Sequence, residues 1–123
     1  MRNLILMAAL ATVLAACQSK TAKVQQFIDG VYVNQSRSDL SVANDTLTFT
    51  HTGAGHYLVT RNTGYQAIRE GKLLPKKFER GKFDGIYDPQ NRVLNETTTG
   101  RVFRFDPDKG ELYLKRAVYR KLN

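Results

Sequence analysis

Hydrophobic and polar residues alternate along much of the chain from Val24 onward. This two-residue period is typical of antiparallel strands that turn one face to the core and the other to water. The alternation is clearest over residues 45–50, where two apolar side chains stand between three threonines, so we expect that segment to be a strand. The same pattern places six side chains in one predicted core: Leu47, Phe49, Phe103, Phe105, Leu112 and Leu114.

Residues that favour turns divide this alternating part of the chain into short segments. We predict strands over residues 30–36, 45–50, 56–61, 65–70, 77–87, 92–96, 101–105, 111–115 and 117–122. We predict turns at residues 44–45, 52–55, 62–64, 88–91 and 97–100. The clearest hairpin turn is at residues 106–110, where Pro107 is preset for a turn and Gly110 is free to adopt a positive φ. Residues 24–28 are predicted to form one helical turn.

Many short strands at this spacing predict an all-β fold. The expected fold is an antiparallel up-and-down meander that closes into a small barrel, because an open meander would leave two exposed edges. A chain of 123 residues, of which 41% are hydrophobic, has room for one modest core. The predicted barrel domain covers residues 27–123, and the length excludes large multidomain enzymes.

The first sixteen residues have a different pattern. Arg2 supplies a positive charge, and residues 4–16 are apolar apart from Thr12. This run is shorter than the roughly 20 apolar residues that a membrane-spanning helix needs. It ends at the polar residues 18–21. Residues 1–16 are therefore predicted to be a signal peptide and not a permanent span.

The end of this segment reads Leu14-Ala15-Ala16-Cys17 and resembles the lipobox of bacterial lipoproteins. The resemblance implies a diacylglycerol thioether on Cys17, cleavage just before it, and acylation of the freed amine, for which palmitate is expected. Two or three buried acyl chains anchor a protein stably, whereas one myristoyl chain is marginal. The alternative is an ordinary signal peptide followed by a buried cysteine. As the chain's single cysteine, Cys17 has no internal disulfide partner.

The residues after the cysteine bear on localisation. Gln18 stands where family members retained at the inner membrane often carry Asp, so the resemblance implies sorting to the outer membrane. Lys20 and Lys23 replace the acidic cluster used for export to the cell surface, which favours an orientation toward the periplasm. Residues 17–26 are predicted to be the lipidated cysteine and a tether that keeps the domain within about 12–18 Å of the bilayer.

The start of the barrel resembles the lipocalin-like plan, in which Gly-x-Trp opens the first strand and a late arginine packs over the ring. Here the motif is Gly30-Val31-Tyr32, with Tyr32 in place of the tryptophan, and the chain has no Trp. The resemblance implies a lipocalin-like barrel. It also implies that Arg116 or Arg120 supplies the cation over Tyr32.

A second resemblance covers the whole chain loosely. The lipobox, the short tether, Gly-x-Tyr-x-Asn at residues 30–34, Leu-x-Leu at 112–114 and Val-Tyr-Arg-Lys at 118–121 are similar to the small β lipoproteins of Bacteroidetes. Some of those are carried by conjugative transposons. The resemblance implies a membrane-anchored role in the envelope and no particular chemistry.

The chain is basic, with a formal net charge of +8 and a sequence pI near 9.8, which indicates acidic partners or anionic surfaces. Its densest basic region covers residues 69–82, with Phe78 and Phe83 interleaved. This region is a candidate contact for phosphates of lipid headgroups or lipopolysaccharide; we expect no nucleic-acid partner. The alternative is a solvated edge strand protected from aggregation, since Glu70 and Glu79 dilute the charge. The candidate contact residues are Lys72, Lys76, Lys77, Arg80 and Lys82.

The sequence lacks the phosphate-binding motif Gly-x-x-x-x-Gly-Lys, the metalloprotease motif His-Glu-x-x-His and the nucleophile motif Gly-x-Ser-x-Gly. His51 and His56 flank a predicted turn, but two imidazoles are too few for a structural zinc site, so no metal and no cofactor are expected. Residues 45–47 read Asp-Thr-Leu and resemble the O-glycosylation motif of exported Bacteroidetes proteins, which makes Thr46 a candidate for modification.

These observations favour a lipid-anchored, non-catalytic protein of the outer membrane. In the first interpretation it binds a protein partner as a binding or structural accessory of an envelope assembly, such as a conjugation apparatus. The second interpretation is a lipocalin-like binder of one small apolar ligand. A third is a binder of anionic lipid or lipopolysaccharide through the basic face. An enzyme would need a cleft with two coupled titratable groups.

Overall fold

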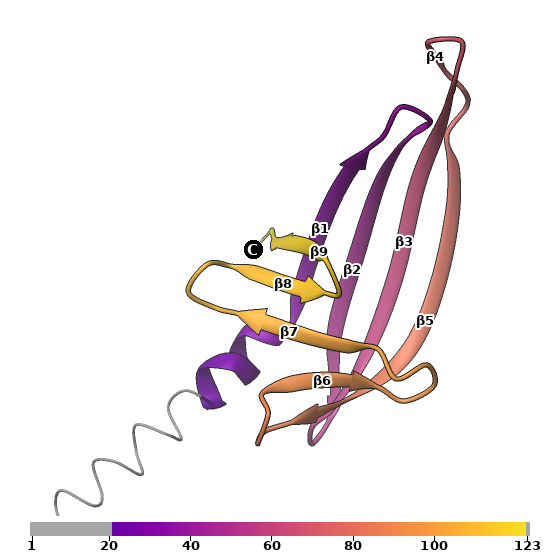
Figure 1. Ribbon diagram of the computed structural model, residues 1–123. Coiled ribbons are helices and arrows are strands. Elements are labelled where there is room, and N and C mark those ends of the chain that lie inside the picture. The colour runs from indigo at the N-terminus through magenta and orange to yellow at the C-terminus, as the bar shows by residue number, and fades with distance from the viewer. Residues whose placement is uncertain (1–20, 123) are drawn as a thin grey trace, which may run out of the picture.

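A computed structural model describes residues 21–122 of the chain as a helix at residues 21–28 followed by nine antiparallel strands (Figure 1). The strands are β1 (Gly30–Arg37), β2 (Ser41–Gly53), β3 (His56–Arg69), β4 (Lys72–Leu73), β5 (Lys77–Asp88), β6 (Val93–Glu96), β7 (Val102–Asp106), β8 (Glu111–Leu114) and β9 (Ala117–Lys121).

Eight of these strands form a closed barrel. Neighbours in sequence pair in turn from β1 to β9, except that the short β4 pairs only with β3 and lies outside the ring. The ring closes where β9 returns to β1, with Tyr32 opposite Lys121 and Val33 opposite Arg120. The predicted all-β meander that closes into a small lipocalin-like barrel is therefore confirmed, and closure removes the exposed edges of the sheet.

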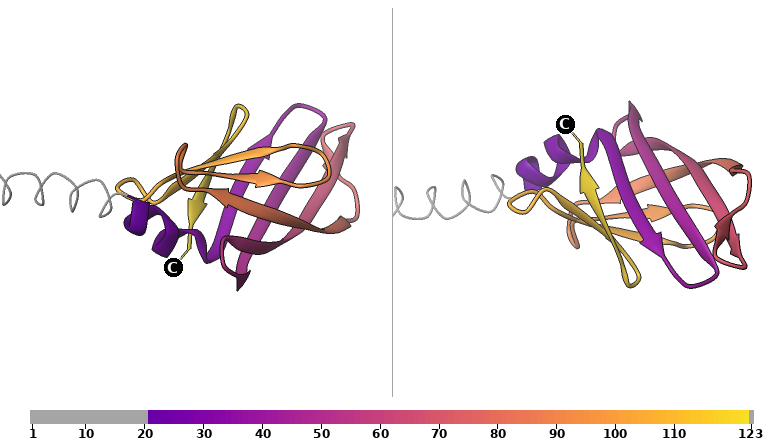
Figure 2. Two further views of the ribbon diagram at one scale, coloured as in Figure 1. Left: turned by 90° about the horizontal axis from the view of Figure 1, so that it is seen from below. Right: turned by 90° about the horizontal axis from the view of Figure 1, so that it is seen from above.

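The two sides of the barrel have different lengths. Strands β1, β2, β3 and β5 have 8 to 14 residues, whereas β6 to β9 have 4 or 5. Figure 2 shows the short strands, in orange and yellow, lying opposite the long ones. The long strands extend past the ring as an uncovered sheet, and the helix lies at the other end (Figure 1). One end of the barrel is thus capped and the other is open.

Aromatic side chains fill the capped half of the barrel. Tyr32 and Phe49 pack edge to face with centroids 5.2 Å apart, and Phe103 meets Phe49 in the same way at 5.4 Å. Phe83 stacks on Phe103 at 6.0 Å. All six side chains predicted to share a core do so: five are buried, and Phe105 is partly buried against them. Such aromatic pairs add to the stability gained from burying the rings.

The helix closes the capped end. Val24 and Ile28 are buried in the core, and the Tyr32 hydroxyl donates to the carbonyl oxygens of Phe27 and Ile28 at 2.7 and 2.9 Å. The predicted helical turn is confirmed, but the helix is longer and covers residues 21–28 of the part of the chain that the structure describes. Residues 21–26, which the expected tether included, therefore belong to the folded domain.

Two predicted turns are wrong. Residues 44–45 and 62–64 lie inside β2 and β3, which run without interruption, and the first hairpin turns instead at residues 38–40. Asp45 is buried and paired inside the barrel. Gly64 is buried because Lys76 and Phe78 cover it: a Cβ at this position would lie 2.8 Å from Lys76 Cε and 3.3 Å from the Phe78 ring. In both cases a residue type that favours turns lies inside a strand, where it contacts a neighbouring part of the sheet.

The cation over Tyr32 is also different from the predicted one. The Lys121 ammonium lies 5.7 Å from the Tyr32 ring centroid and 4.4 Å from that of Phe27, and it donates to the Phe27 carbonyl oxygen. The β1–β9 register puts Lys121 opposite Tyr32 on the inner face, whereas Arg120 is on the outer face and exposed. Arg116 lies just before β9, at the end of that strand away from Tyr32.

Candidate functional site

The open end of the barrel contains two adjoining hollows that share Arg61 and Arg101; we call this region the mouth. The larger, of about 520 Å³, is lined by Arg61, Thr63, Glu79, Arg80, Gly81, Lys82, Phe83, Glu96, Thr98, Thr99 and Arg101. The smaller, of about 300 Å³, is lined by Arg61, Arg101, Leu114, Lys115, Arg116, Ala117 and Tyr119. The shared arginines join the two hollows, and the combined lining carries more basic than acidic side chains.

A buried carboxylate fixes the first arginine. Arg61 donates from Nε to both Asp45 oxygens at 3.1 and 3.0 Å and from Nη2 to Oδ2 at 2.6 Å. Thr63 donates to the same carboxylate at 3.0 Å, and the buried Tyr119 hydroxyl donates as well. Asp45 is only 7% exposed. This charge-assisted network holds the guanidinium in one orientation.

The electrostatics of the network follow from these contacts. Burial alone would raise the pKa of the Asp45 carboxyl, but the hydrogen bonds from Arg61, Tyr119 and Thr63 outweigh it and keep that pKa below its usual value. Burial, together with the hydrogen bond to Asp45, raises the pKa of Tyr119. Asp45 is therefore ionised and Tyr119 neutral near pH 7.

The second arginine lies across the mouth from the first. The Arg101 guanidinium carbon is 5.5 Å from the Phe83 ring centroid, and its Nε is 3.8 Å from a carboxylate oxygen of Glu96. Glu96 is 4% exposed and also accepts a hydrogen bond from Thr99. A buried carboxylate thus stands behind each arginine, while the two arginine side chains are about one-third exposed.

Both arginines keep donors for a ligand. Asp45 engages Nε and Nη2 of Arg61, so Nη1 has no hydrogen-bond acceptor among residues 21–122. The same holds for both terminal nitrogens of Arg101 within that part of the chain. Guanidinium groups with free, parallel N–H donors match the geometry of carboxylate and phosphate oxygens. The mouth can therefore bind a small anion.

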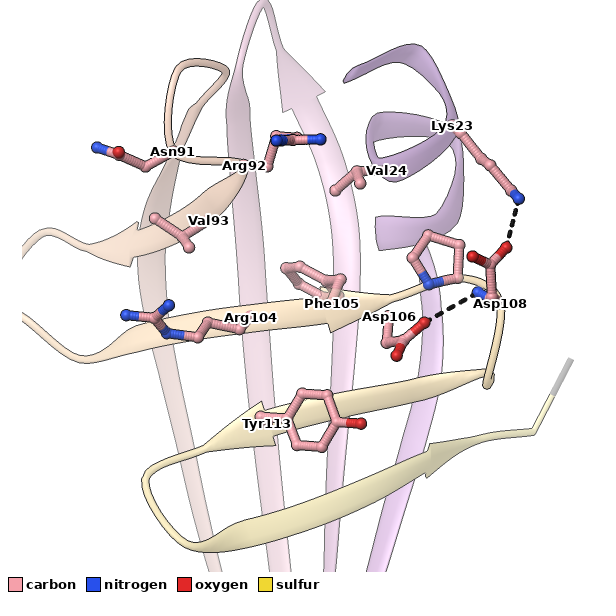
Figure 3. A pocket seen from close by; sticks show the side chains of 11 residues that line it. Lys23, Val24, Asn91, Arg92, Val93, Arg104, Phe105, Asp106, Asp108 and Tyr113 are labelled. Carbon is pink, nitrogen blue, oxygen red and sulfur yellow. Dashed lines mark hydrogen bonds and ion pairs between the residues drawn. The ribbon is translucent and has the colours of Figure 1, made fainter. Parts of the chain in front are cut away.

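A third hollow, of about 620 Å³, lies beside the helix, between it and residues 91–93 and 104–108 (Figure 3). Lys23 of the helix pairs there with Asp108 at 2.5 Å, and Arg92 and Arg104 lie along its other side. The Lys23 and Asp108 side chains are 60% and 77% exposed, so their ion pair is weak. Although this hollow is larger, its basic side chains are exposed and no buried carboxylate among residues 21–122 fixes them, so the mouth is the better positioned site.

The structure separates the predicted basic contact residues. Strand alternation places Arg80 and Lys82 on the outer face of β5 and Lys77 on the inner face, whereas Lys76 precedes the strand and lies beside Gly64. All five candidates are exposed, and Arg80 and Lys82 also line the mouth. The basic region is therefore no single face, and its contact with anionic surfaces stays a prediction.

The other predicted sites have ordinary surroundings. Thr46 is half-buried in the middle of the sheet, between Val33 of β1 and Asn62 of β3. The His51 ring lies 5.1 Å from that of Tyr57. Within residues 21–122, no group of three His, Cys, Asp or Glu side chains could hold a metal ion. Modification of Thr46 stays a prediction.

The lipobox residues Leu14, Ala15, Ala16 and Cys17 lie outside the described residues, so signal cleavage and lipidation stay predictions. In the part of the chain that the structure describes, the helix is too short and too polar to cross a membrane. Comparison of the chain with protein-family models, curated proteins and solved structures finds no match. The geometry of the mouth is therefore the main guide to function.

Arg80 and Lys82 of the mouth were predicted contact residues, whereas Arg61, Arg101, Asp45 and Glu96 were not predicted as site residues, although the sequence carries a signal for two of them. Asp45 lies two residues before Leu47 and four before Phe49, so all three face the same side of a strand. Arg101 likewise lies two residues before Phe103. A charged residue that continues the inward-facing positions of a strand indicates a polar site at the end of a barrel. Asp45 was instead placed in a predicted turn.

Proposed function

We propose that this protein is a lipid-anchored binding protein of the bacterial envelope whose barrel mouth binds a small ligand with an anionic group. The observation that carries the proposal is the pair Arg61 and Arg101, each backed by a buried carboxylate and each with N–H donors that no group of residues 21–122 occupies. The small size of the barrel supports a binder of one small molecule.

The ligand's anionic group would be a carboxylate or a phosphate. Two guanidinium groups pair with such oxygens in a bidentate way, and the hydroxyl groups of Thr98 and Thr99 line the same hollow. Phe83 and Leu114 give the mouth an apolar surface that a short apolar part of the ligand could contact. The alternative of a purely apolar ligand has less support, because aromatic side chains already fill the capped half.

The envelope location belongs to the same proposal and depends on the Leu14 to Cys17 motif. A lipid anchor would keep the mouth near a membrane and restrict the ligand to molecules of the envelope. A role as an accessory of an envelope assembly, including a conjugation apparatus, is compatible with a small binding domain and needs a protein partner that binds elsewhere on the barrel.

The binding proposal is tested by titrating the chain from Gln18 onward with inorganic phosphate and with succinate, followed by calorimetry or NMR. The helix, every strand and the core lie within residues 21–122, so this piece holds the complete barrel. Arg101→Gln should weaken binding about tenfold or more, because a charge-assisted pair contributes about 1.5–3 kcal/mol. Arg104→Gln, on the outer face of β7, is the matched control and should bind as the wild type does. Equal affinity of the two variants would refute the proposal.

A further inference from the structure

The end of the molecule farthest from the helix is formed by two hairpin turns. We call it the hairpin tip and define it as residues 37–40 and 68–78. The Ile68 amide donates to the Leu40 carbonyl oxygen at 2.7 Å, and Leu73 is the partner of Ile68 in the β3–β4 pair. The two leucines therefore flank one residue of β3. Both turns lie at the top of Figure 1, opposite the helix.

Three large apolar side chains are exposed here. Leu40 is 75% exposed, Leu73 is 56% exposed and Phe78 is 58% exposed. Single exposed hydrophobic residues are common on protein surfaces, whereas a group at one end of a molecule indicates an interaction site. Leu40 and Leu73 lie at the two turns, Phe78 lies over Gly64 on the outer face of the sheet, and none of the three lines one of the hollows described above.

Cations surround the apolar side chains. The exposed basic residues of the hairpin tip are Arg37, Arg69, Lys72, Lys76 and Lys77. Its acidic residues are Asp39 and Glu70, so the hairpin tip carries a net positive charge. Within residues 21–122 the ion pairs all lie elsewhere, in the mouth and beside the helix. The ammonium and guanidinium groups of the hairpin tip are therefore available to an anionic partner.

Both turns have fixed conformations. Glu70 and Gly71 have φ values of 53° and 74°, the positive pair that a two-residue type I′ hairpin turn requires. In the other turn, Ser38 Oγ accepts from the amides of Leu40 and Ser41 at 3.3 and 3.2 Å. Preformed turns present the two leucines with little loss of conformational entropy on binding.

We propose that the hairpin tip docks on an anionic lipid surface, with Leu40 and Leu73 entering the interface and the surrounding cations contacting the headgroups. Apolar side chains beside lysines and arginines are the composition of interfacial membrane contacts. Lysine is depleted in protein–protein interfaces, and a specific one needs about 800 Å² per partner. Exposed leucines would add nothing to contacts with a nucleic-acid backbone.

This surface differs from the basic region predicted from sequence. It adds Leu40 and Arg37 from the first hairpin, and it leaves out Arg80 and Lys82, which lie farther along β5 toward the barrel. It is also independent of the mouth. A strand of 13 residues spans about 40 Å. The hairpin tip and a lipid anchor at the helix end would therefore contact lipid at opposite ends of the molecule.

The test measures co-flotation of the chain from Gln18 onward with vesicles of phosphatidylcholine that contain about 30% phosphatidylglycerol. Each cation near an anionic surface strengthens binding roughly fivefold. Leu40→Ser with Leu73→Ser should reduce binding about tenfold or more. The matched control, Val118→Ser with Leu122→Ser, removes exposed apolar side chains elsewhere on the barrel and should leave binding unchanged. Circular dichroism checks that each variant is folded.

A second measurement reports insertion directly. The chain has no Trp, so Leu40→Trp provides a single fluorophore whose emission should shift to the blue with anionic vesicles and not with pure phosphatidylcholine. Leu122→Trp should show no shift. Absence of vesicle binding by the wild type, equal loss in the control pair, or no blue shift for Leu40→Trp would overturn the proposal. Binding to a soluble polyanion that survives loss of both leucines, without vesicle binding, would also overturn it.

Discussion

Replacing Asp45 by Asn tests the network at the mouth. The substitution keeps the shape of the side chain but removes the charge that accepts hydrogen bonds from Arg61, Thr63 and Tyr119. Removing one partner of a buried ion pair costs about 3–5 kcal/mol, but the Arg61 side chain is 32% exposed and can regain water. We therefore expect a loss of about 2–3 kcal/mol in the free energy of unfolding at pH 7.

The effect should depend on pH in a definite direction. The folded-state pKa of Asp45 lies below its unfolded value, so its contribution to stability is complete above the unfolded pKa. That contribution declines as the pH falls below about 4 and is gone below the folded pKa. The stability difference between the wild type and Asp45→Asn should shrink accordingly.

Urea unfolding of both proteins at pH 7 and at about pH 3 measures this difference. Asp108→Asn is the control, because Asp108 pairs with Lys23 at the surface and should not change stability measurably. A loss for Asp45→Asn no larger than that of the control, or a loss that is the same at both pH values, would refute the description of the mouth as a buried, charge-dependent network.

Three further predictions concern the core, the barrel wall and the anchor. Phe103→Ala should cost about 3–5 kcal/mol in urea unfolding, because Phe103 is fully buried, while Val102→Ala on the outer face should cost less than about 1 kcal/mol. Gly85→Ala should cost about 1–3 kcal/mol, since a Cβ there would lie 2.9 Å from the Leu94 side chain; an unchanged unfolding midpoint would contradict that packing. Cys17→Ala should abolish labelling of the protein by a fatty-acid analogue in cells, and equal labelling of both proteins would exclude the lipid anchor.

The strand pattern was predictable because burial on one face imposes a period of two on the sequence. Leu47, Phe49 and Phe103 follow that period and lie in the core as expected. The hairpin at residues 106–110 was predictable because its geometry is local: Gly110 has a φ of 69°.

The errors have one physical cause, which is that distant partners decide the role of a residue. Gly64 lies in a strand because Phe78 covers it, and Asp45 is buried because Arg61 neutralises it across the sheet. The identity of Lys121 as the cation over Tyr32 depends on the β1–β9 register, which closes the barrel between the two ends of the chain. The residues close to Lys121 in the sequence do not determine that register.

The mouth was not predictable as a site for the same reason. Arg61 and Arg101 belong to different sides of the ring, and they line one hollow only in the closed barrel. Their sequence neighbours mark them as inward-facing, but only the closed barrel places them around one hollow. The hairpin tip likewise joins a turn at residues 38–40 to β4, more than thirty residues later in the chain.

The most direct test of the account is to follow the Nε–Hε NMR signals of the arginine side chains while phosphate or succinate is added to the wild-type barrel. The signals of Arg61 and Arg101 should shift together with one dissociation constant, and those of Arg104 and Arg120 on the outer face should stay in place. Shifts confined to Arg104 and Arg120, or shifts of equal size in all four, would contradict a binding site at the mouth.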